Sequence, residues 1–357
     1  MAETDLGLPV LRRVEQVRYL GEPPLIVGFP PSNTVLDMGI KLEDWHKYDA
    51  ARLWKELARF PNGHKANANL YINMGNQCLH VGEYQIPFHD LDAHLGGNGV
   101  NVMLTTHALS RGSNTHPPQC EFPISYPILE FPGIKDILTQ NGITPQPINT
   151  PPRLGIKLPD GRVLNTRPKY YDDIDSIQQF SPGVCYIGNM PISWYEQLVT
   201  MDSPSTDFVW SPSSSDIRAI QAGKMREFLL GPLLGKTSLV VMNGHEEEIV
   251  SRALSVPMSV YANRVVITHG PNPVIYHEKG TARTYSFEPH SKANSAYQVG
   301  AGDSFTAGMI HGLFHQGMNM PEAVALGVGV AQRVLQMPES NMGHLSTGEI
   351  AGFLGSL

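Results

Sequence analysis

The sequence has few of the features that mark disulfide-rich, membrane-spanning or nucleic-acid-binding proteins. Its three cysteines in 357 residues, Cys78, Cys120 and Cys185, are too few and too widely spaced for a disulfide framework or a zinc site. No run approaches the ~18 apolar residues of a membrane helix, and the N-terminus lacks the apolar core of a secretory signal. A net charge of −7 offers no basic surface for nucleic acid or anionic lipid. We therefore expect a cytoplasmic protein that binds a small-molecule substrate, with no nucleic-acid or membrane partner.

The apolar pattern predicts an α/β fold. Short apolar runs at residues 24–29, 183–188, 237–243 and 264–270 predict buried strands, and segments of helical spacing follow most of them. Strands that alternate with helices form mostly parallel sheets covered on both faces. No element is predicted for the proline-rich residues 113–152.

Turn and capping signals predict further elements. Hairpins are expected at 153–167 and 273–287, where alternating residues flank turn formers. Helical spacing at 49–60 predicts a helix, and residues 78–86 alternate loosely like one strand. A late helix is expected to begin near Asn319, because an Asn-x-x-Glu capping box stands there.

The segment VGAGD (299–303) combines glycines with one acid directly before a predicted helix. Gly300 and Gly302 permit backbone angles that other residues avoid, and the helix start offers unpaired N–H groups at the positive end of its dipole. These features predict an anion site. Asp303 would repel a resident anion, but as a base it would accept the proton of a hydroxyl that attacks a phosphoryl group. The alternative is that Asp303 only N-caps the helix.

Asn243 and Glu246 stand three residues apart where a predicted strand ends and a helix begins. Carbonyl and carboxylate oxygens are the ligands that Mg²⁺ prefers, often through its retained waters. The spacing therefore predicts a magnesium site, and the alternative is a solvated acidic first turn. His245 has no partner histidine at a spacing that suits a transition metal.

Two features of the N-terminal part suit a polyhydroxylated ligand. GGNGVN (96–101) lacks the Gly-Lys-Ser/Thr ending of a P-loop, but its glycines allow close approach to the backbone, and Asn101 offers both a donor and an acceptor. Asp37 follows the first predicted strand, at the edge where ligands gather in doubly wound sheets. A tight turn before a helix and a surface aspartate are the structural alternatives.

In this order, the four segments resemble motifs of the ribokinase-like (PfkB) carbohydrate kinase family. VGAGDSFTAG (299–308) is similar to the C-terminal signature and GGNGVN (96–101) to the N-terminal Gly-Gly signature. NGHE (243–246) is similar to the Asn-x-x-Glu magnesium motif, and THG (268–270) to the Thr-x-Gly beside the nucleotide. The resemblance is best over about residues 180–350.

The resemblance implies a ribokinase-like three-layer sandwich, with a central mostly parallel sheet and a small β-lid. Residues 1–357 are expected to form a single kinase domain. Lid or insertion segments are expected at about 38–95 and 153–170, and the nucleotide-binding half at about 180–357. Residues 38–95 are longer than the family usually has, which favours an enlarged lid or a homodimer contact there.

The activity implied by the resemblance is transfer of the ATP γ-phosphoryl group to a hydroxyl, commonly a hydroxymethyl, of a sugar or nucleoside. ATP and Mg²⁺ are the expected cofactors, with a monovalent cation as a further candidate. Asp303 would be the base. The other implied roles are an anion hole of Gly300, Ala301 and Gly302; water-mediated Mg²⁺ contacts from Asn243 and Glu246; acceptor contacts from Asp37, Gly96, Gly97, Asn98 and Asn101; and nucleotide contacts from Thr268, Gly270, Asn341 and Gly343.

The chain departs from the family pattern at two places. Tyr297 and Gln298 replace the usual Asp-Thr before the Gly-Ala-Gly-Asp sequence, beside the phosphoryl site. Asn98 stands where related kinases often have lysine, which disfavours an acceptor that already carries a phosphate.

Three alternatives stay open on the sequence. SNTVLD (32–37) resembles the start of the 1-phosphofructokinase and tagatose-phosphate kinase branch, in which case Arg153, Lys157 or Arg167 would supply cations for a phosphosugar. A non-catalytic PfkB-like ligand-binding protein is a second alternative, which the intact acidic motifs disfavour. A dinucleotide dehydrogenase is disfavoured because no Gly-x-Gly-x-x-Gly follows the first predicted strand.

Overall fold

A computed structural model describes most of the chain, and the statements below concern the described residues. These are residues 26–28, 35–49, 52, 70–73, 75–113, 120–148, 154–157, 163–165, 183–202, 206–278, 285–287, 300–337 and 341–357. Apart from Asp49 and Arg52, the predicted helix at 49–60 lies outside them, as do Arg153, Arg167, Tyr297 and Gln298.

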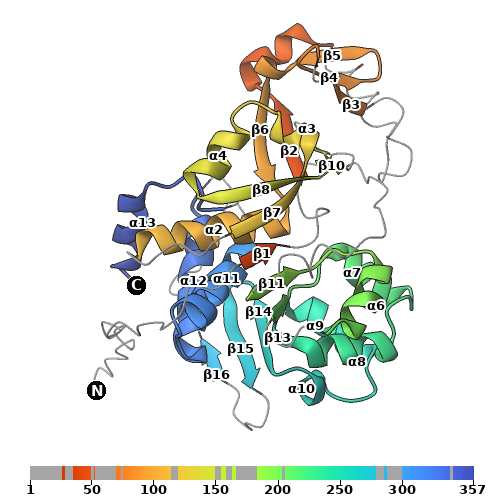
Figure 1. Cartoon of the computed structure of the whole chain (residues 1–357), viewed down its shortest axis with the longest axis vertical. Helices are drawn as coiled ribbons and strands as arrows, with labels where there is room; N and C mark the ends of the chain where they lie inside the picture. The colour runs from red at the N-terminus through yellow and green to blue at the C-terminus, as the bar shows by residue number, and fades with distance from the viewer. Residues whose placement is uncertain are drawn as a thin grey trace.

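A nine-stranded sheet forms the centre of the described part of the chain (Figure 1). The sheet is parallel from β14 through β13, β12, β11, β1 and β7 to β8, and β15 and β16 continue it in antiparallel pairing beyond β14. In spatial order the strands are β16 (Tyr285–Phe287), β15 (Asn272–Glu278), β14 (Arg264–His269), β13 (Thr237–Asn243), β12 (Asp207–Trp210), β11 (Val184–Ile187), β1 (Ile26–Gly28), β7 (Cys120–Ser125) and β8 (Ile143–Ile148). The α/β prediction is confirmed.

Helices cover both faces of this sheet. One face carries α2 (Asn98–Gly112), α11 (Ala301–Ile310), the π-helical segment η6 (His311–His315), α12 (Met320–Val334) and α13 (Thr347–Leu354). The other carries α6 (Ile192–Thr200), α7 (Ser214–Gln221), α8 (Glu227–Lys236), α9 (Gly244–Arg252) and α10 (Met258–Tyr261).

The alternation along β13 explains why its sequence is apolar throughout. Leu239 and Val241 pack in one core with Phe305 of α11, whereas Val240 and Met242 pack in the opposite core with Leu233 of α8. Because successive side chains of a strand point to opposite faces, a strand between two helical layers needs apolar residues at every position.

Within the proline-rich stretch 113–152, for which the sequence predicted no element, residues 120–148 form a strand–helix–strand unit of the main sheet. Between β7 and β8 lie two short helices, α3 (Tyr126–Leu129) and α4 (Ile134–Gln140). Pro145 and Pro147 lie in β8, which is the edge of the sheet. An edge strand tolerates proline because its outer side has no ladder hydrogen bonds to lose.

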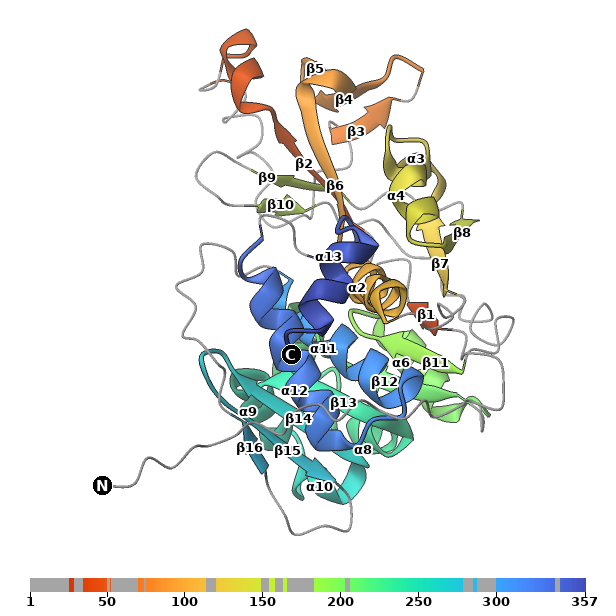
Figure 2. The same ribbon diagram turned by 90° about the vertical axis from the view of Figure 1, so that its left-hand side faces the viewer.

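Two smaller sheets lie together at one end of the molecule, away from β14–β16 (Figures 1 and 2). The first has the order β10 (Val163–Asn165), β9 (Leu154–Lys157), β2 (Val35–Ile40) and β6 (Leu91–Gly96). The second contains β3 (Leu70–Asn73), β4 (Cys78–Val81) and β5 (Tyr84–Pro87). Residues 78–86, predicted as one strand, are thus a hairpin that turns at Gly82, whose φ of 60° favours glycine.

A buried carboxylate links two short helices, η2 (Leu42–Lys47) and η5 (Phe88–Asp90), at the end of the molecule that carries the small sheets. Asp90 of η5, 3% exposed, accepts hydrogen bonds from Lys47 Nζ (2.8 Å) and Tyr48 Oη (2.6 Å). Lys47 ends η2. The bonds from Lys47 and Tyr48 hold the pKa of Asp90 below its usual value.

The predicted hairpins and late helix are confirmed. β9 pairs antiparallel with β10, and β15 with β16. Helix α12 begins after Asn319, whose side chain accepts from the Glu322 N–H while the Glu322 carboxylate accepts from the Asn319 N–H. This is the capping box that the sequence predicted.

Candidate active site

Asp303 lies in the first turn of α11, which begins directly after a left-handed glycine. Gly300 is the N-cap residue, with φ of 86° and ψ of −8°. Because L residues with a side chain rarely adopt this conformation, the turn requires glycine. The N-cap position is held by Gly300, and Asp303 is the third residue of the helix. The alternative in which Asp303 is the N-cap residue of α11 is therefore not observed.

The start of α2 brings two asparagines to the same place. Gly97 precedes α2 with φ of 97° and ψ of 151°, which again requires glycine. Helices α2 and α11 lie side by side (Figures 1 and 2), and Asn101 Nδ2 donates to Asp303 Oδ2 over 2.9 Å. Asn98 also hydrogen-bonds the Asp303 carboxylate. Asp303, the expected base, is thus hydrogen-bonded to Asn98 and Asn101, two of the expected acceptor-binding residues.

The surroundings of Asp303 favour a proton acceptor near neutral pH. Burial raises its pKa to about 6, and the hydrogen bonds from Asn101 and Asn98 oppose this rise. A general base works best when its pKa is close to the operating pH, because it is then both ionised and sufficiently basic. The free N–H groups of the first turn of α11, from Ala301 onward, lie beside it.

Asn243 and Glu246 form a reciprocal capping box at the start of α9. The Glu246 N–H donates to Asn243 Oδ1 (2.9 Å), and the Asn243 N–H donates to Glu246 Oε2 (2.8 Å). Burial, together with the nearby charge of Asp216, raises the pKa of Glu246 against the effect of the Asn243 hydrogen bonds. The two residues therefore cap the acidic first turn of α9, which is the alternative to a magnesium site that the sequence left open.

The same two residues still fit a water-mediated magnesium contact. The capping bonds use Glu246 Oε2, so the second carboxylate oxygen remains for a water ligand of the ion. No group of three or more His, Cys, Asp or Glu residues within the described ranges could hold a metal directly. A hexahydrated or partly hydrated ion held through its waters is the mode that this arrangement suits.

Tyr186 is a central residue that the sequence did not single out. It is fully buried in β11, and burial raises its pKa well above its usual value, with further contributions from the charges of Asp303, Asp216 and Glu246. The charges of three carboxylates therefore act on one phenol. No motif signals this residue, because a tyrosine inside an apolar strand is indistinguishable from core.

Asp216 was missed although its signal was present. Ser213 and Asp216 form a capping box at the start of α7, and Asp216 Oδ2 accepts from the Ser213 and Asn189 N–H groups, each over 2.7 Å. Asn189 follows β11 in the left-handed region, with φ of 56°. The Ser-x-x-Asp spacing could have predicted this helix start.

The first pair of expected nucleotide residues lies at the end of β14. Asn243 of β13 pairs in register with Thr268, whose Oγ1 donates to the Met242 carbonyl over 3.5 Å. Gly270 follows with φ of 60°. A Cβ at Gly244 would lie 2.5 Å from the His269 ring, so the start of α9 packs closely on this strand end. The expected magnesium and nucleotide residues are therefore neighbours.

The second expected nucleotide pair lies elsewhere, against α2. Asn341 is 8% exposed, and its Nδ2 donates to Asn101 Oδ1 over 3.2 Å. The Gly343 N–H donates to Asn341 Oδ1 (3.0 Å), and a Cβ at Gly343 would lie 3.0 Å from Leu104 Cβ. Asn341 therefore contacts Asn101, the residue that donates a hydrogen bond to Asp303.

The remaining expected acceptor residues lie in the first small sheet. Asp37 of β2 pairs with His94 of β6 and with Gly155 of β9, and Gly96 at the end of β6 pairs with Val35. Since β6 ends at Gly96 and α2 begins at Asn98, only Gly97 separates this sheet from the Asp303 partners.

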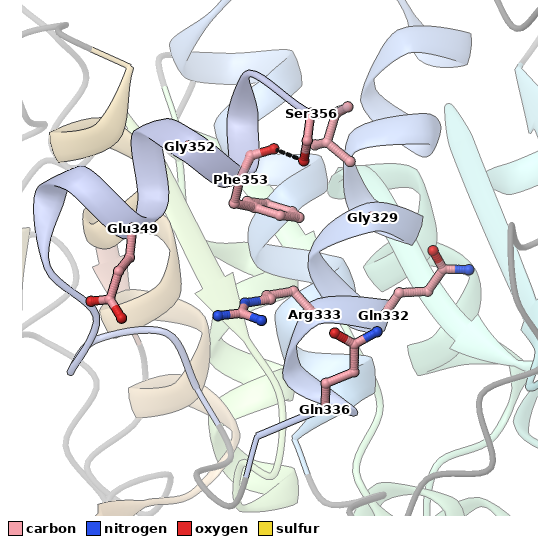
Figure 3. A pocket seen from close by; sticks show the side chains of 9 residues that line it. Gly329, Gln332, Arg333, Gln336, Glu349, Gly352, Phe353 and Ser356 are labelled. Atoms are coloured by element: carbon pink, nitrogen blue, oxygen red, sulfur yellow. Dashed lines mark hydrogen bonds between the residues drawn. The ribbon is translucent and has the colours of Figure 1, made fainter.

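A polar pocket of about 410 Å³ lies between α12 and α13, and none of the expected site residues lines it (Figure 3). Gln332 and Arg333 of α12, and Gln336 just after that helix, line the pocket together with Glu349 and Phe353 of α13. Gly329, Gly352, Ser356 and Leu357 complete the lining.

Comparison with known proteins identifies the family that the chain is similar to. A model of the pfkB family carbohydrate kinases matches residues 187–344. The search of curated proteins gave no match. Within the described residues no helix is long and apolar enough to cross a membrane.

Solved structures of kinases share the fold over nearly the whole chain. A ribokinase from Thermotoga maritima is 14% identical, with a TM-score of 0.59, and the match covers 93% of this chain and 99% of that one. Adenosine kinase from Schistosoma mansoni is 15% identical, with a TM-score of 0.63, and the match covers 93% of this chain and 100% of that one. A nucleoside kinase from Methanocaldococcus jannaschii is 12% identical, with a TM-score of 0.60, and the match covers 94% of this chain and 100% of that one. The ribokinase-like fold and the resemblance to PfkB kinases are confirmed.

Proposed function

Because the chain has the ribokinase-like fold and matches the PfkB carbohydrate kinases over 187–344, we propose that it transfers the γ-phosphoryl group of ATP to a hydroxyl of a sugar or nucleoside. The observation that carries this proposal is the position of Asp303. Its carboxylate lies in the first turn of α11 with a pKa of about 6, between two helix N-termini whose N–H groups favour anions.

Asp303 is the base of the proposed reaction. The acceptor hydroxyl gives its proton to the Asp303 carboxylate while its oxygen forms a bond to the γ-phosphorus. The bond from that phosphorus to the β–γ bridging oxygen breaks, and ADP leaves with the electron pair. The N–H groups of Ala301 and Gly302, at the positive end of α11, stabilise the charge on the phosphoryl oxygens during transfer.

The residues at the ends of β13 and β14 hold the nucleotide side of the site. Asn243 and Glu246 would hold Mg²⁺ through its waters, and the bound ion would supply positive charge beside the β- and γ-phosphates. Thr268 and Gly270, at the adjacent strand end, contact the nucleotide. The carboxylates of Glu246, Asp216 and Asp303 give this region a negative field that favours a cation.

The first small sheet supplies the acceptor side and acts as the lid. Asp37 and Gly96 lie on paired strands of this sheet, and Gly97 joins it to Asn98 and Asn101. Asn98 offers an amide where a lysine would favour a phosphorylated acceptor, so a hydroxymethyl group of an unphosphorylated sugar or nucleoside is the proposed acceptor. The phosphosugar alternative keeps one supporting observation: β9, which carries Lys157, pairs directly with β2.

A panel of acceptors tests this function. The purified chain is incubated with ATP, Mg²⁺ and, in parallel, sugars, their phosphates and nucleosides, and acceptor-dependent ADP release is measured against ATP alone. ADP release with an unphosphorylated sugar or nucleoside supports the proposal, and release with sugar phosphates alone supports the phosphosugar kinase. Tight ligand binding with no ADP release would instead indicate a non-catalytic binding protein.

A further inference from the structure

We propose that Asn341 is a positioning residue, which acts through Asn101 to present an N–H donor to the Asp303 carboxylate. The inference rests on the proposed function, in which Asp303 is the base, and it replaces the nucleotide contact expected for Asn341. It assigns to the loop at 341–345 the task of orienting the catalytic carboxylate.

Three hydrogen bonds in series connect the loop to the base. The Gly343 N–H donates to Asn341 Oδ1 (3.0 Å), Asn341 Nδ2 donates to Asn101 Oδ1 (3.2 Å), and Asn101 Nδ2 donates to Asp303 Oδ2 (2.9 Å). The direction of the series follows from its first member. A backbone N–H can only donate, so the Asn341 oxygen must face Gly343 and its nitrogen must face Asn101.

The same logic fixes the Asn101 amide. Its oxygen must accept from Asn341, so its nitrogen faces Asp303. With the opposite orientation, an amide oxygen would face a carboxylate oxygen in a site that is 3% exposed at Asn101. Such a pairing is repulsive, and burial strengthens the repulsion because little water screens it.

The loop that starts the series is itself held firmly on α2. The Met342 N–H donates to Thr105 Oγ1 (3.2 Å), and the Gly343 carbonyl accepts from Asn141 Nδ2 (2.9 Å). The Arg111 guanidinium donates to the Leu345 carbonyl (3.1 Å) and to Asn141 Oδ1 (3.2 Å). A rigid support of this kind is what a positioning residue requires, since its geometry must be set before the substrate binds.

The protonation of Asp303 depends on this series of hydrogen bonds. A hydrogen bond to the ionised form of a carboxyl lowers its pKa, and here the Asn101 and Asn98 bonds act against burial. The other described titratable group that interacts with Asp303 is the buried Tyr186 of β11. Without Asn341, the Asn101 amide loses the hydrogen bond that fixes its orientation, its N–H donates to Asp303 for only part of the time, and Asp303 holds its proton to a higher pH.

The test compares Asn341→Leu, which is close to asparagine in volume, with Asn341→Ala in case the larger side chain prevents folding. The matched control is Thr105→Val, which removes a different hydrogen bond between this loop and α2 and leaves the series intact. The first readout is the carboxyl ¹³C resonance of Asp303, identified by its absence in Asp303→Asn and followed between about pH 4 and about pH 8. It requires no turnover.

In the Asn341 variants, we expect the titration midpoint of the Asp303 carboxyl to rise by about one pH unit. In Thr105→Val we expect no shift of this midpoint. The acid limb of the pH–kcat profile moves by the same amount. An unchanged midpoint together with a raised KM for ATP would overturn the inference and make Asn341 a nucleotide contact. Normal turnover by Asp303→Asn would overturn the proposed function instead, and the ¹³C midpoint would still decide the role of Asn341.

Discussion

Asn101 Nδ2 lies 2.9 Å from Asp303 Oδ2, although the two residues are 202 positions apart in the chain. The contact joins the helix that follows the Gly-Gly turn to the helix that follows the Gly-Ala-Gly turn, so the acceptor side and the phosphoryl side of the proposed site share one hydrogen bond.

The pH dependence of turnover should follow the Asp303 carboxyl. Because its pKa is raised to about 6, the base is protonated and inactive below that value and ionised above it. We expect kcat/KM to rise through an apparent pKa of about 6 when measured with saturating Mg²⁺. An acid limb close to the ordinary aspartate value of 3.8 would show that the group is not buried in the working enzyme.

Asp303→Asn should make the folded protein more stable. The carboxyl has a pKa of 3.8 when unfolded and about 6 when folded, so the folded state holds the proton more tightly and loses stability as the pH rises between these values. We expect the variant to gain about 3 kcal/mol in unfolding free energy above about pH 7, measured by urea denaturation, and nothing near about pH 4. Asp92→Asn, at an exposed position of β6, is the control and should show no such gain.

Gly300→Ala should remove activity, whereas Gly133→Ala should not. Both glycines are N-cap residues in the left-handed region, with φ of 86° and 81°. A side chain there costs about 1–2 kcal/mol in either helix. Only the change at Gly300 displaces the N–H groups beside Asp303, for which we expect kcat to fall about 100-fold. Equal losses of activity in the two variants would point to general destabilisation.

Glu246→Gln should weaken the response to magnesium. Glutamine can still accept the Asn243 N–H bond, so the capping box survives while the charge near the ion is lost. We expect the Mg²⁺ concentration for half-maximal activity to rise at least about tenfold. The control is Glu322→Gln, which makes the same change in the matching capping box of α12. If both variants keep the wild-type magnesium response, Glu246 does not serve the ion.

Buried histidines should make the fold sensitive to acid. Burial lowers the pKa of His107 to about 4 and of His311 to about 3, so below the unfolded value of 6.5 the unfolded chain binds more protons. Stability should therefore fall as the pH drops from 6.5 toward 4, by about 3 kcal/mol for each histidine.

This fall is best measured in Asp303→Asn, because the Asp303 carboxyl acts in the opposite direction over the same range. Adding His107→Gln to that protein should flatten the decline in melting temperature, and adding His94→Gln, at an exposed position, should leave it unchanged. A decline of equal slope in all three proteins would mean that other groups cause the acid sensitivity.

Much of the fold could be predicted because the main-sheet strands obey a simple rule. A strand between two helical layers needs apolar residues at every position, and β13 meets this requirement from Leu239 to Met242. The unit formed by β7 and β8 was missed because prolines argue against strands. The structure resolves this conflict by placing Pro145 and Pro147 in an edge strand, a position that the sequence does not reveal.

The candidate site was only partly predictable, for a similar reason. Glycines with positive φ next to an acid are a local signal, and Gly300 and Asp303 carry it. The contact of Asn101 with Asn341 spans 240 positions and involves an amide that could serve many roles. Nothing in a single sequence states that this amide faces another asparagine rather than a ligand.

The rate of phosphotransfer by Asp303→Asn tests the central claim most directly. Using the acceptor found in the panel, transfer of the labelled γ-phosphoryl group is followed at saturating ATP and Mg²⁺, together with ATP affinity by equilibrium binding. We expect kcat to fall by a factor of about 10²–10⁴, with ATP affinity nearly unchanged because the backbone N–H groups stay in place. A variant that turns over at the wild-type rate would contradict the assignment of Asp303 as the base.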